Sequence, residues 1–331
     1  MPMVLPADSA RPFGAVLTAM VTPMTPDGAV DLKAAVKLAK KLVDDGNDGL
    51  VLSGTTGESP VTHTPEKVEL VAAVVEAVGD RAAILAGAGS NDTAHAIRMA
   101  TQAADAGADG LLVVSPYYSR PTQEGLYQHF AAVADSTELP VMLYDIPGRS
   151  GVRIAPETFA RIAEHPRVVA NKDATGDVWS AEQLIETTGL AWYSGDDGLL
   201  LPFLSVGGAG IVSVSAHVVG QRFAEVVRLW DAGDHTGALR VYRTTVPVVN
   251  ALNGAGAQAV MAKAALQAQG VLEHRTLRLP NVAASDHEVA HLRAVLVAGG
   301  VIPASAHPMS PPELPEDASA VIGHPAIATP R

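Results

Sequence analysis

Lys172 has the clearest capacity for covalent chemistry. It ends the apolar run VVANK at 168–172, so it lies at the end of an expected strand. Alternate residues of a strand point to the same side, so Lys172 shares the side of Val168 and Ala170. A lysine among apolar neighbours has a lowered pKa, and its neutral amine can form a Schiff base with a ketone. Taken alone, a solvated lysine at a strand end is the more ordinary alternative.

The run GTTGES at 54–59 follows the apolar run DGLVL. Its small residues let the backbone approach a ligand closely. Thr55 and Thr56 bring hydroxyl groups and N–H donors together, an arrangement that suits a carboxylate. A plain turn with a capping threonine explains the stretch about as well when nothing else is considered.

The run YDIPGRSG at 144–151 follows another expected strand. Tyr144 shares the side of Met142, and Arg149 lies just after a Pro-Gly turn. An arginine in this place can bind a substrate carboxylate with two parallel hydrogen bonds. A core tyrosine and a surface ion pair remain the alternative for these two residues alone.

Three other patterns are explained better by structure than by chemistry. HEVAH at 287–291 fits a zinc-protease motif, but the apolar stripe with Leu292 and Leu296 leaves its histidines on a surface face, so we expect no metal. GGAG at 207–210 precedes a strand instead of opening a helix, which favours tight packing over phosphate binding. The acidic pair in SGDDG at 194–198 is attributed to capping of the next helix.

Strand and helix patterns alternate from Gly14 onward, and the chemical residues above stand where strands end. Helical periodicity and glycine stops predict a helix after each strand. The expected strands are 14–23, 48–52, 82–87, 109–114, 139–145, 167–172, 190–195 and 208–214. Eight such units in about 220 residues fit an α/β fold of the (β/α)8 TIM-barrel type, whose chemistry sits at the carboxyl ends of the strands. A doubly wound sheet would need a glycine-rich turn after the first strand, and VTPMTPDG is not one.

The strand pattern stops near Gly233, and three helices are predicted at 235–253, 255–270 and 285–300. We therefore divide the chain into a flexible N-terminal tail at 1–12, a barrel at 13–233, a C-terminal helical region at 234–301 and a disordered tail at 302–331. The last segment is rich in proline and alanine without periodicity.

The composition restricts the class of protein. The chain has 331 residues, 48% of them hydrophobic, a net charge of −12 and no cysteine. The negative charge argues against a nucleic-acid partner, since phosphate binding needs a basic surface. Without cysteine there is no disulfide or thiol nucleophile, which fits the cytoplasm. No apolar run reaches the roughly 18 residues of a membrane span, and the N-terminus has no apolar signal core.

Four motifs at strand ends, GTTGES, SPYYSRPTQEG, YDIPGRSG and KDATG, occur in this order. From about Phe13 to about Val301 the chain resembles the 4-hydroxy-tetrahydrodipicolinate synthase (dihydrodipicolinate synthase) family of pyruvate-dependent Schiff-base lyases. The resemblance implies condensation of pyruvate with L-aspartate 4-semialdehyde to 4-hydroxy-tetrahydrodipicolinate, the first committed step of the diaminopimelate and lysine pathway. Alternatives are a family aldolase or dehydratase acting on another 2-oxo acid, and a barrel retained as a non-catalytic binding protein.

The resemblance implies roles for the residues of the reaction itself. Lys172 matches the lysine that forms the Schiff base with pyruvate, and Tyr144 matches a tyrosine that relays protons. Thr55 matches the threonine that links this tyrosine to a second one. Tyr118 matches that second tyrosine, which the family inserts from a neighbouring subunit.

Three further residues match positions that bind substrate. Thr56 corresponds to a residue that helps to hold the pyruvate carboxylate, and Arg149 to the arginine that binds the carboxylate of the semialdehyde. Members acting on sugar acids generally lack this arginine, so its presence favours the synthase. Ile211 matches a residue whose backbone carbonyl approaches the lysine.

The family also implies the surroundings of the enzyme. No metal or organic cofactor is expected, because the lysine imine serves as the electron sink. The expected partners are the two substrates and further copies of the chain, as a dimer of dimers (a homotetramer), with no nucleic acid and no membrane. The expected location is the cytoplasm.

The family's feedback site for lysine lies near Ser59, Asn91, His95 and Tyr117 of this sequence. Lysine-sensitive bacterial relatives place a glutamate at the position of His95 and commonly a histidine at that of Lys67. Both replacements reduce attraction for a cationic ligand, so we expect weak or absent inhibition by lysine.

Overall fold

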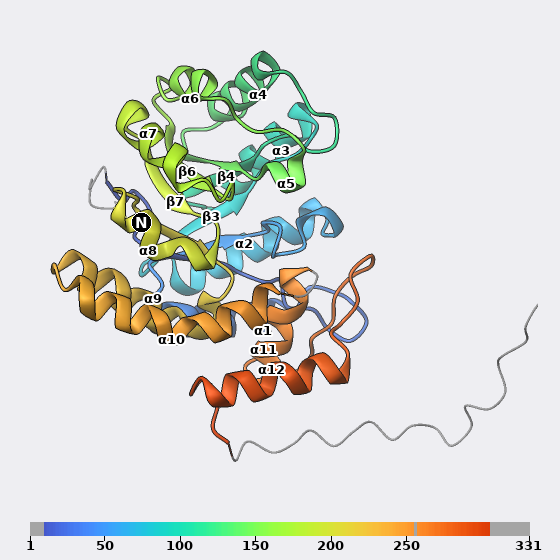
Figure 1. Cartoon of the computed structure of the whole chain (residues 1–331). Coiled ribbons are helices and arrows are strands. Elements are labelled where there is room, and N and C mark those ends of the chain that lie inside the picture. Colours follow the sequence, from blue (N-terminus) through green and yellow to red (C-terminus); the bar gives the residue numbers. More distant parts are fainter. Residues whose placement is uncertain (1–9, 255–256, 305–331) are drawn as a thin grey trace, which may run out of the picture.

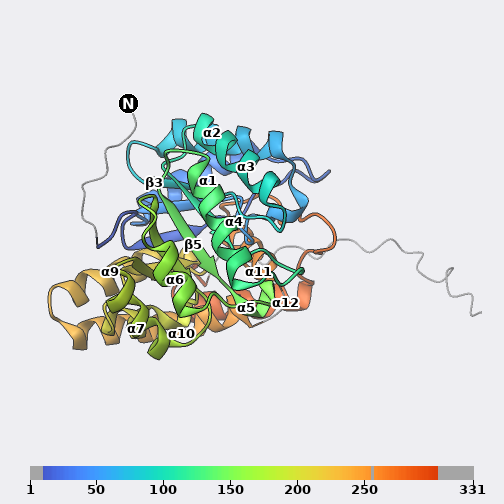
Figure 2. The same ribbon diagram turned by 90° about the horizontal axis from the view of Figure 1, so that it is seen from above.

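The computed structural model describes residues 10–254 and 257–304 of the chain. Its centre is a closed barrel of eight parallel strands in sequence order (Figures 1 and 2). The strands are β1 (Val16–Ala19), β2 (Gly49–Leu52), β3 (Ala83–Gly87), β4 (Gly110–Val114), β5 (Val141–Asp145), β6 (Val168–Asp173), β7 (Ala191–Ser194) and β8 (Gly210–Ser213). The TIM barrel predicted from the sequence is confirmed, and closure of the sheet excludes the doubly wound alternative.

Helices follow the strands and form the outer layer. The α-helices of this layer are α1 (Leu32–Asp44), α2 (Thr64–Val78), α3 (Thr93–Asp105), α4 (Gln123–Asp135), α5 (Pro147–Ser150), α6 (Pro156–Ile162), α7 (Val178–Thr188), α8 (Leu200–Ser205) and α9 (Ala216–Asp231). Two short 3-10 turns, η1 (Ser59–Val61) and η2 (Asp197–Leu199), precede α2 and α8. Gly189 ends α7 in the left-handed region, where it can adopt φ +68° without the clash that a Cβ would cause.

The strands read as continuous apolar runs because they are covered on both faces. The inner face carries one apolar cluster that includes Leu17, Val51, Met142, Tyr144 and Tyr193. The outer face packs against the helices through larger clusters. Burial on both sides is typical of parallel sheets and explains why strand parity in the sequence separates inward from outward side chains.

The C-terminal helical region predicted from the sequence is also confirmed. It consists of α10 (His235–Asn253), α11 (Gln258–Ala268) and α12 (Asp286–Ala298), and α10 packs along α9 (Figure 1). Leu292 and Leu296 of α12 are fully buried in the cluster that joins these helices to the barrel.

The tail boundaries of the proposed division remain a prediction. Arg11 bonds both Asp231 and the carbonyl of Ala209, and Ile302 packs into the C-terminal cluster. The remainder of the two terminal segments, at 1–9 and 305–331, lies outside the described residues. Within the described part of the chain, no helix has the length and apolarity to cross a membrane.

Candidate active site

Lys172 and Tyr144 lie side by side on neighbouring strands. They are register partners across β6 and β5, and the Lys172 Nζ is 4.3 Å from the centroid of the Tyr144 ring. Their exposed fractions are 5% and 6%. The strand parity in the sequence predicted an inward lysine, and its contact with Tyr144, a member of the inner cluster, agrees with that prediction.

The barrel interior raises the neutral fraction of the Lys172 amine near neutral pH. Burial lowers the pKa of its amine to about 8, since a charged ammonium loses its hydration there. The negative charges of Asp197 and Asp196 oppose this shift, whereas the positive charge of Arg149 adds to it. About a tenth of the amine is therefore neutral at pH 7, far more than for a solvated lysine.

The pKa of Tyr144 is shifted in the opposite direction from that of Lys172. Burial raises the pKa of its phenol to about 12, with the Arg149 charge acting against the shift. The hydroxyl group therefore keeps its proton across the physiological range. It can pass a proton on while remaining uncharged, as a relay group must.

A cavity of about 220 Å³ opens beside this pair. Tyr144, Arg149, Thr55 and Tyr117 are among its lining residues. Lys172 is not among them, but its amine contacts the ring of Tyr144, which is. The cavity therefore joins three of the sequence-predicted site residues at the carboxyl ends of β2 and β5.

The GTTGES loop between β2 and η1 lines the cavity from one side. Thr55 is exposed and also lines a second cavity of about 230 Å³, which it shares with Arg149 and with the buried Thr56. The loop is anchored on the barrel side, where the Thr22 hydroxyl donates to the carbonyl of Gly57 at 2.7 Å. Small residues and fixed backbone thus present both threonines near the arginine.

Arg149 reaches across from α5. Its Nη2 donates to Oε1 of Gln258, the first residue of α11, at 3.4 Å. The C-terminal region therefore contacts Arg149, which sequence reasoning did not anticipate. The Gln258 amide in turn bonds Asn253 at 2.6 Å, so the arginine is tied to α10 as well.

Tyr118 does not enter the cavity of its own chain. Its side chain is 91% exposed and its φ is +74°, while its neighbour Tyr117 lines the cavity. An outward tyrosine held in the left-handed region agrees with the expectation that this side chain serves a neighbouring subunit.

Ile211 can contribute only its backbone to the barrel interior. Its side chain lies in the outer cluster, and its amide donates to the carbonyl of Ala15 toward β1. The next residue, Val212, belongs to the inner cluster instead. Val212 is therefore the β8 residue whose side chain shares the interior with Lys172.

The acidic pair of SGDDG corrects an expectation from the sequence. Asp196 makes no side-chain cap to η2, so the capping interpretation is wrong for it. Its charge instead acts on the Lys172 amine. The Asp197 carboxylate accepts hydrogen bonds from the Val214 and Ser215 amides and holds the turn after β8.

Gly195 is a further site residue that sequence reasoning missed. A Cβ on this glycine would lie 3.2 Å from Cε of Lys172 and 3.0 Å from Cβ of Ala174. The absence of a side chain leaves space for the lysine. A glycine at the end of a predicted strand was the available signal, but a helix cap explained the stretch equally well.

The described ranges contain no group of three or more His, Asp or Glu side chains placed to hold a metal ion. Glu288 of the HEVAH run bonds Ser285 in a capping box at the start of α12. This contact accounts for the glutamate of the zinc-like motif.

A separate cavity of about 220 Å³ adjoins the first and shares Ser59, Pro60, Gly89 and Tyr117 with it. His95 and Lys67 also line it. The Lys67 amine donates to the Ser59 hydroxyl at 3.0 Å, and burial lowers its pKa. Three of the residues expected near a lysine site, Ser59, His95 and Tyr117, are thus brought together with Lys67.

Comparison with known proteins places these features in a family. The model of the dihydrodipicolinate synthetase family matches residues 12–298. The chain is 58% identical over 275 residues to a 4-hydroxy-tetrahydrodipicolinate synthase of Bifidobacterium longum, covering 83% of this chain and 90% of the relative. It is 56% identical over 291 residues to 4-hydroxy-tetrahydrodipicolinate synthase 2 of Streptomyces coelicolor, covering 88% and 96%.

Solved structures agree with this similarity. A dihydrodipicolinate synthase of Bacillus anthracis superposes with a TM-score of 0.83 at 43% identity, covering 86% of this chain and 97% of that one. The chloride-inhibited dihydrodipicolinate synthase of Acinetobacter baumannii, solved with pyruvate, gives a TM-score of 0.84 at 36% identity, covering 88% and 100%.

Proposed function

The chain belongs to the dihydrodipicolinate synthetase family, and we propose that Lys172 captures pyruvate as a Schiff base in the cavity beside Tyr144. The enzyme is a lyase that condenses pyruvate with L-aspartate 4-semialdehyde to 4-hydroxy-tetrahydrodipicolinate, in the diaminopimelate and lysine pathway. The observation that carries the assignment of the nucleophile is one buried amine whose pKa is lowered to about 8 at the carboxyl end of a barrel strand.

The Lys172 amine is the only protein group that forms a covalent bond to substrate in the proposed reaction. The neutral Lys172 attacks C2 of pyruvate, and loss of one water leaves an iminium ion. This cation withdraws electrons from the methyl group, which loses a proton to give an enamine. The enamine carbon attacks the aldehyde of the second substrate, whose oxygen takes up a proton. The amino group of that substrate then displaces Lys172 from the imine carbon, which closes the ring and regenerates the amine.

Proton transfers in these steps are assigned to Tyr144, Thr55 and Tyr118 of a neighbouring subunit. A hydroxyl relay needs its members within about 2.6–3.2 Å of each other. The high pKa of Tyr144 and its contact with Lys172 support its place beside the imine. The outward direction of Tyr118 supports a donor shared between subunits.

Substrate carboxylates are assigned to polar groups of the two cavities that share Thr55 and Arg149. Thr56 and the loop amides bind pyruvate, and Arg149 binds the carboxylate of the semialdehyde through its guanidinium. The backbone of Ile211 is assigned to the wall beside Lys172, and the side chain of Val212 belongs to the inner cluster of the barrel.

No metal or organic cofactor takes part in this proposal, because the lysine imine itself accepts the electron pair. The enzyme works as an oligomer of at least two chains, a dimer of dimers in the full assembly, and acts in the cytoplasm. The position of Tyr118 supports the oligomer, since its hydroxyl cannot serve its own cavity from an exposed position.

Borohydride reduction in the presence of pyruvate tests the nucleophile. We expect intact-protein mass spectrometry to show one reduced pyruvate per chain and peptide mapping to place it on Lys172. Lys172→Arg should remove the adduct. Turnover with L-aspartate 4-semialdehyde then separates the synthase from an aldolase acting on another 2-oxo acid. No adduct, or an adduct on a different lysine, contradicts the proposal.

A further inference from the structure

A fully buried ion pair joins the C-terminal region to the GTTGES loop. Lys263 of α11 and Glu58 of the loop are 205 residues apart in sequence, and the Nζ–Oε1 distance is 2.5 Å. Both side chains have an exposed fraction of 0%. A lysine on an apolar helix face is uncommon unless it is paired, so the contact calls for an explanation.

Each end of the pair is further bonded by the segment after α11. The Lys263 amine donates to the carbonyl of Thr276 at 2.7 Å, and the second oxygen of Glu58 accepts from the Arg278 amide at 3.0 Å. Both charged groups are therefore directed by backbone as well as by each other.

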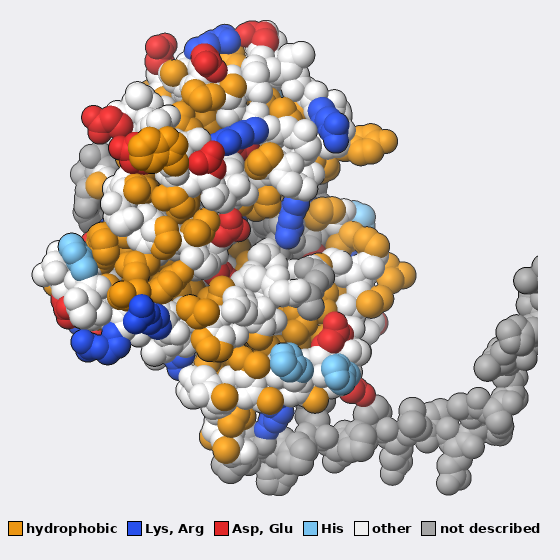
Figure 3. Space-filling view, in the orientation of Figure 1, with side chains coloured by type: hydrophobic (Ala, Val, Ile, Leu, Met, Phe, Trp, Pro, Cys, Tyr) orange, Lys and Arg blue, Asp and Glu red, His pale blue; other side chains and the backbone are white. Residues whose placement is uncertain are grey.

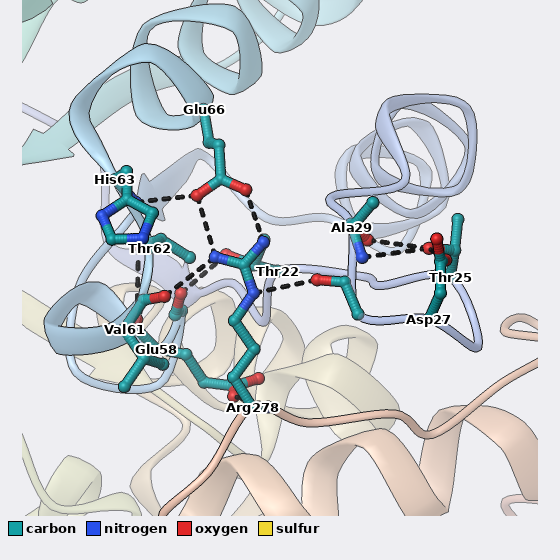
Figure 4. Close-up of polar contacts among 12 residues, drawn as sticks. Thr22, Thr25, Asp27, Ala29, Glu58, Val61, Thr62, His63, Glu66 and Arg278 are labelled. Carbon is teal, nitrogen blue, oxygen red and sulfur yellow. Dashed lines mark hydrogen bonds and ion pairs between the residues drawn. The ribbon is translucent and has the colours of Figure 1, made fainter.

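The Arg278 side chain extends this attachment to the loop around η1 (Figure 4). Its guanidinium donates at 2.8 Å to the carbonyl of Val61 in η1 and at 2.8 Å to that of Gly28 between β1 and α1. It also binds both carboxylate oxygens of Glu66 in α2. The segment at 276–278 thus fastens the loop after β2 at several points, with Glu58 nearest to the substrate threonines.

The backbone of Glu58 shows why the loop needs fastening. Its φ is +58°, a left-handed conformation that costs free energy in any residue with a Cβ. Its N–H donates to the carbonyl of Thr55 at 3.1 Å, and its own carbonyl accepts from Val61 at 3.0 Å. Glu58 therefore ends the tight turn that presents Thr55 and Thr56.

The ion pair fixes the position of the Glu58 turn more than it adds to the net stability of the fold. Burial lowers the pKa of Lys263, whereas the charge of Glu58 and their hydrogen bond oppose that shift. The loss of hydration of two charges largely offsets their attraction, so apolar side chains at these two positions would stabilise the fold at least as well. An ionic pair, unlike an apolar one, fixes the direction of the Glu58 side chain and the turn attached to it.

We propose that Lys263 is a positioning residue for pyruvate binding, acting through Glu58 to hold the turn of Thr55 and Thr56 against the cavity. This inference rests on the proposed function, because it takes the two threonines as part of the pyruvate site. It assigns to the C-terminal region a part in the reaction that the barrel alone does not supply.

The test is Lys263→Met, assayed by the pyruvate concentration that gives half-maximal borohydride trapping on Lys172. Methionine keeps the length of the side chain and removes the charge and the donors. We expect the half-saturating concentration to rise about tenfold, the factor for loss of one well-placed hydrogen bond. The pH dependence of the trapping rate, which reports the pKa of Lys172, should not change, since Lys263 does not contact that amine.

Leu292→Ala is the matched control for stability. Leu292 is fully buried in α12, so its truncation lowers the melting temperature without touching the loop. The double variant Glu58→Gln with Lys263→Met removes both charges together, which leaves no lone buried charge and so preserves folding if the single variant does not fold. It should show the same rise in half-saturation, since the tether is lost in either case.

The outcomes separate the two proposals. If the wild-type chain gives no adduct on Lys172, the proposed function fails first. If the wild-type chain traps pyruvate but Lys263→Met, or the double variant, saturates at the wild-type concentration, the positioning role is overturned. It is also overturned if Leu292→Ala raises half-saturation as much at an equal loss of melting temperature.

Discussion

The surroundings of Lys172 determine the pKa of its amine. The amine is enclosed by the barrel interior, and the nearest carboxylates reduce the pKa shift without cancelling it. A carboxylate in direct contact would hold the amine protonated and unreactive. Contact with the ring of Tyr144, at 4.3 Å, puts an uncharged group in that place instead.

The pH dependence of imine formation follows from this pKa. With the pKa of Lys172 lowered to about 8, most of the amine is protonated below pH 8 and most of it is neutral above pH 8. We expect the rate of borohydride trapping at low pyruvate to rise with pH and level off above about 8. Arg149→Met should move this limb to higher pH, because the arginine charge lowers the pKa of the lysine.

Asp145 supplies the control for that measurement. Burial and the nearby charge of Asp173 raise the pKa of its carboxyl to about 7. Its side chain lies on the face of β5 opposite to Tyr144, so Asp145→Asn should leave the limb in place. A wild-type limb near pH 10, the range of a solvated lysine, contradicts a desolvated nucleophile.

Gly195→Ala tests the space around the lysine. An added Cβ would stand 3.2 Å from Cε of Lys172 and 3.0 Å from both the Asp173 carbonyl oxygen and Cβ of Ala174, so these neighbours must move by a few tenths of an ångström. A misplacement of about 1 Å costs roughly 100-fold in rate, so this smaller shift costs less. We expect turnover to fall about tenfold, with folding retained as judged by circular dichroism.

Gly198→Ala is the matched control, because a Cβ at Gly198 has no neighbouring atom within 4 Å. The two glycines flank the acidic pair of the same loop. Equal losses in both variants would mean that the loop tolerates no side chain at all, and the specific contact with Lys172 would then be refuted.

At the scale of elements, the site is built where strand ends meet helix starts. The strands β5 and β6 supply Tyr144 and Lys172 in register. The loop after β2 supplies the threonines, and its continuation into α2 supplies Lys67 to the adjoining cavity. Two neighbouring cavities thus share the segment around Ser59.

The lining of the adjoining cavity leads to a prediction about feedback inhibition by lysine. Lys67 and His95 line the adjoining cavity, where a lysine ligand would bring its own positive charge. We expect an inhibition constant for L-lysine above a millimolar in a steady-state assay at pH 8. The double variant with Lys67→His and His95→Glu should bind lysine about tenfold more tightly, since it exchanges a cation for a carboxylate.

Lys33→His is the control for that variant, because it makes the same change of residue type on α1, in a different cavity. It should leave inhibition unchanged. An inhibition constant below a millimolar for the wild-type chain would show that the cationic lining does not exclude the ligand.

At the scale of the whole molecule, one described chain holds Lys172, Tyr144 and Thr55 but leaves Tyr118 facing outward. Charged side chains of both signs are interspersed with hydrophobic ones on the face in Figure 3. Exposed large apolar side chains include Tyr118 and Trp179. Because Tyr118 faces outward, the proposed relay is complete only when a second copy of the chain supplies its tyrosine.

Tyr118→Phe should lose most activity, because the proposed relay loses one hydroxyl. The variant should fold normally, because the altered side chain is exposed. Mixing this variant with Lys172→Ala and allowing subunits to exchange gives a sharper test. In a mixed dimer, the chain that keeps Lys172 receives Tyr118 from its partner, so about one site in two is restored when the tyrosine acts between subunits. If the mixture stays inactive although exchange is demonstrated, Tyr118 acts within its own chain.

The sequence by itself determined the barrel, the three C-terminal helices and the placement of Lys172 and Tyr144. Those features follow from local periodicity: strand parity has a period of two, helix faces repeat near 3.6, and glycine marks the stops. Lys172 and Tyr144 lie on consecutive strands of a parallel sheet, so the topology alone makes them neighbours.

Only the tertiary structure decided what lies beside them. The charge of Asp196 on Lys172, the contact of Arg149 with Gln258 and the pairing of Glu58 with Lys263 join segments that no local pattern relates. A single lysine within the apolar pattern of α11 was the one signal in the sequence, and it did not identify a partner. Closure of the barrel and the return of the chain through α10 and α11 bring these residues together, because long-range contacts depend on how whole elements pack.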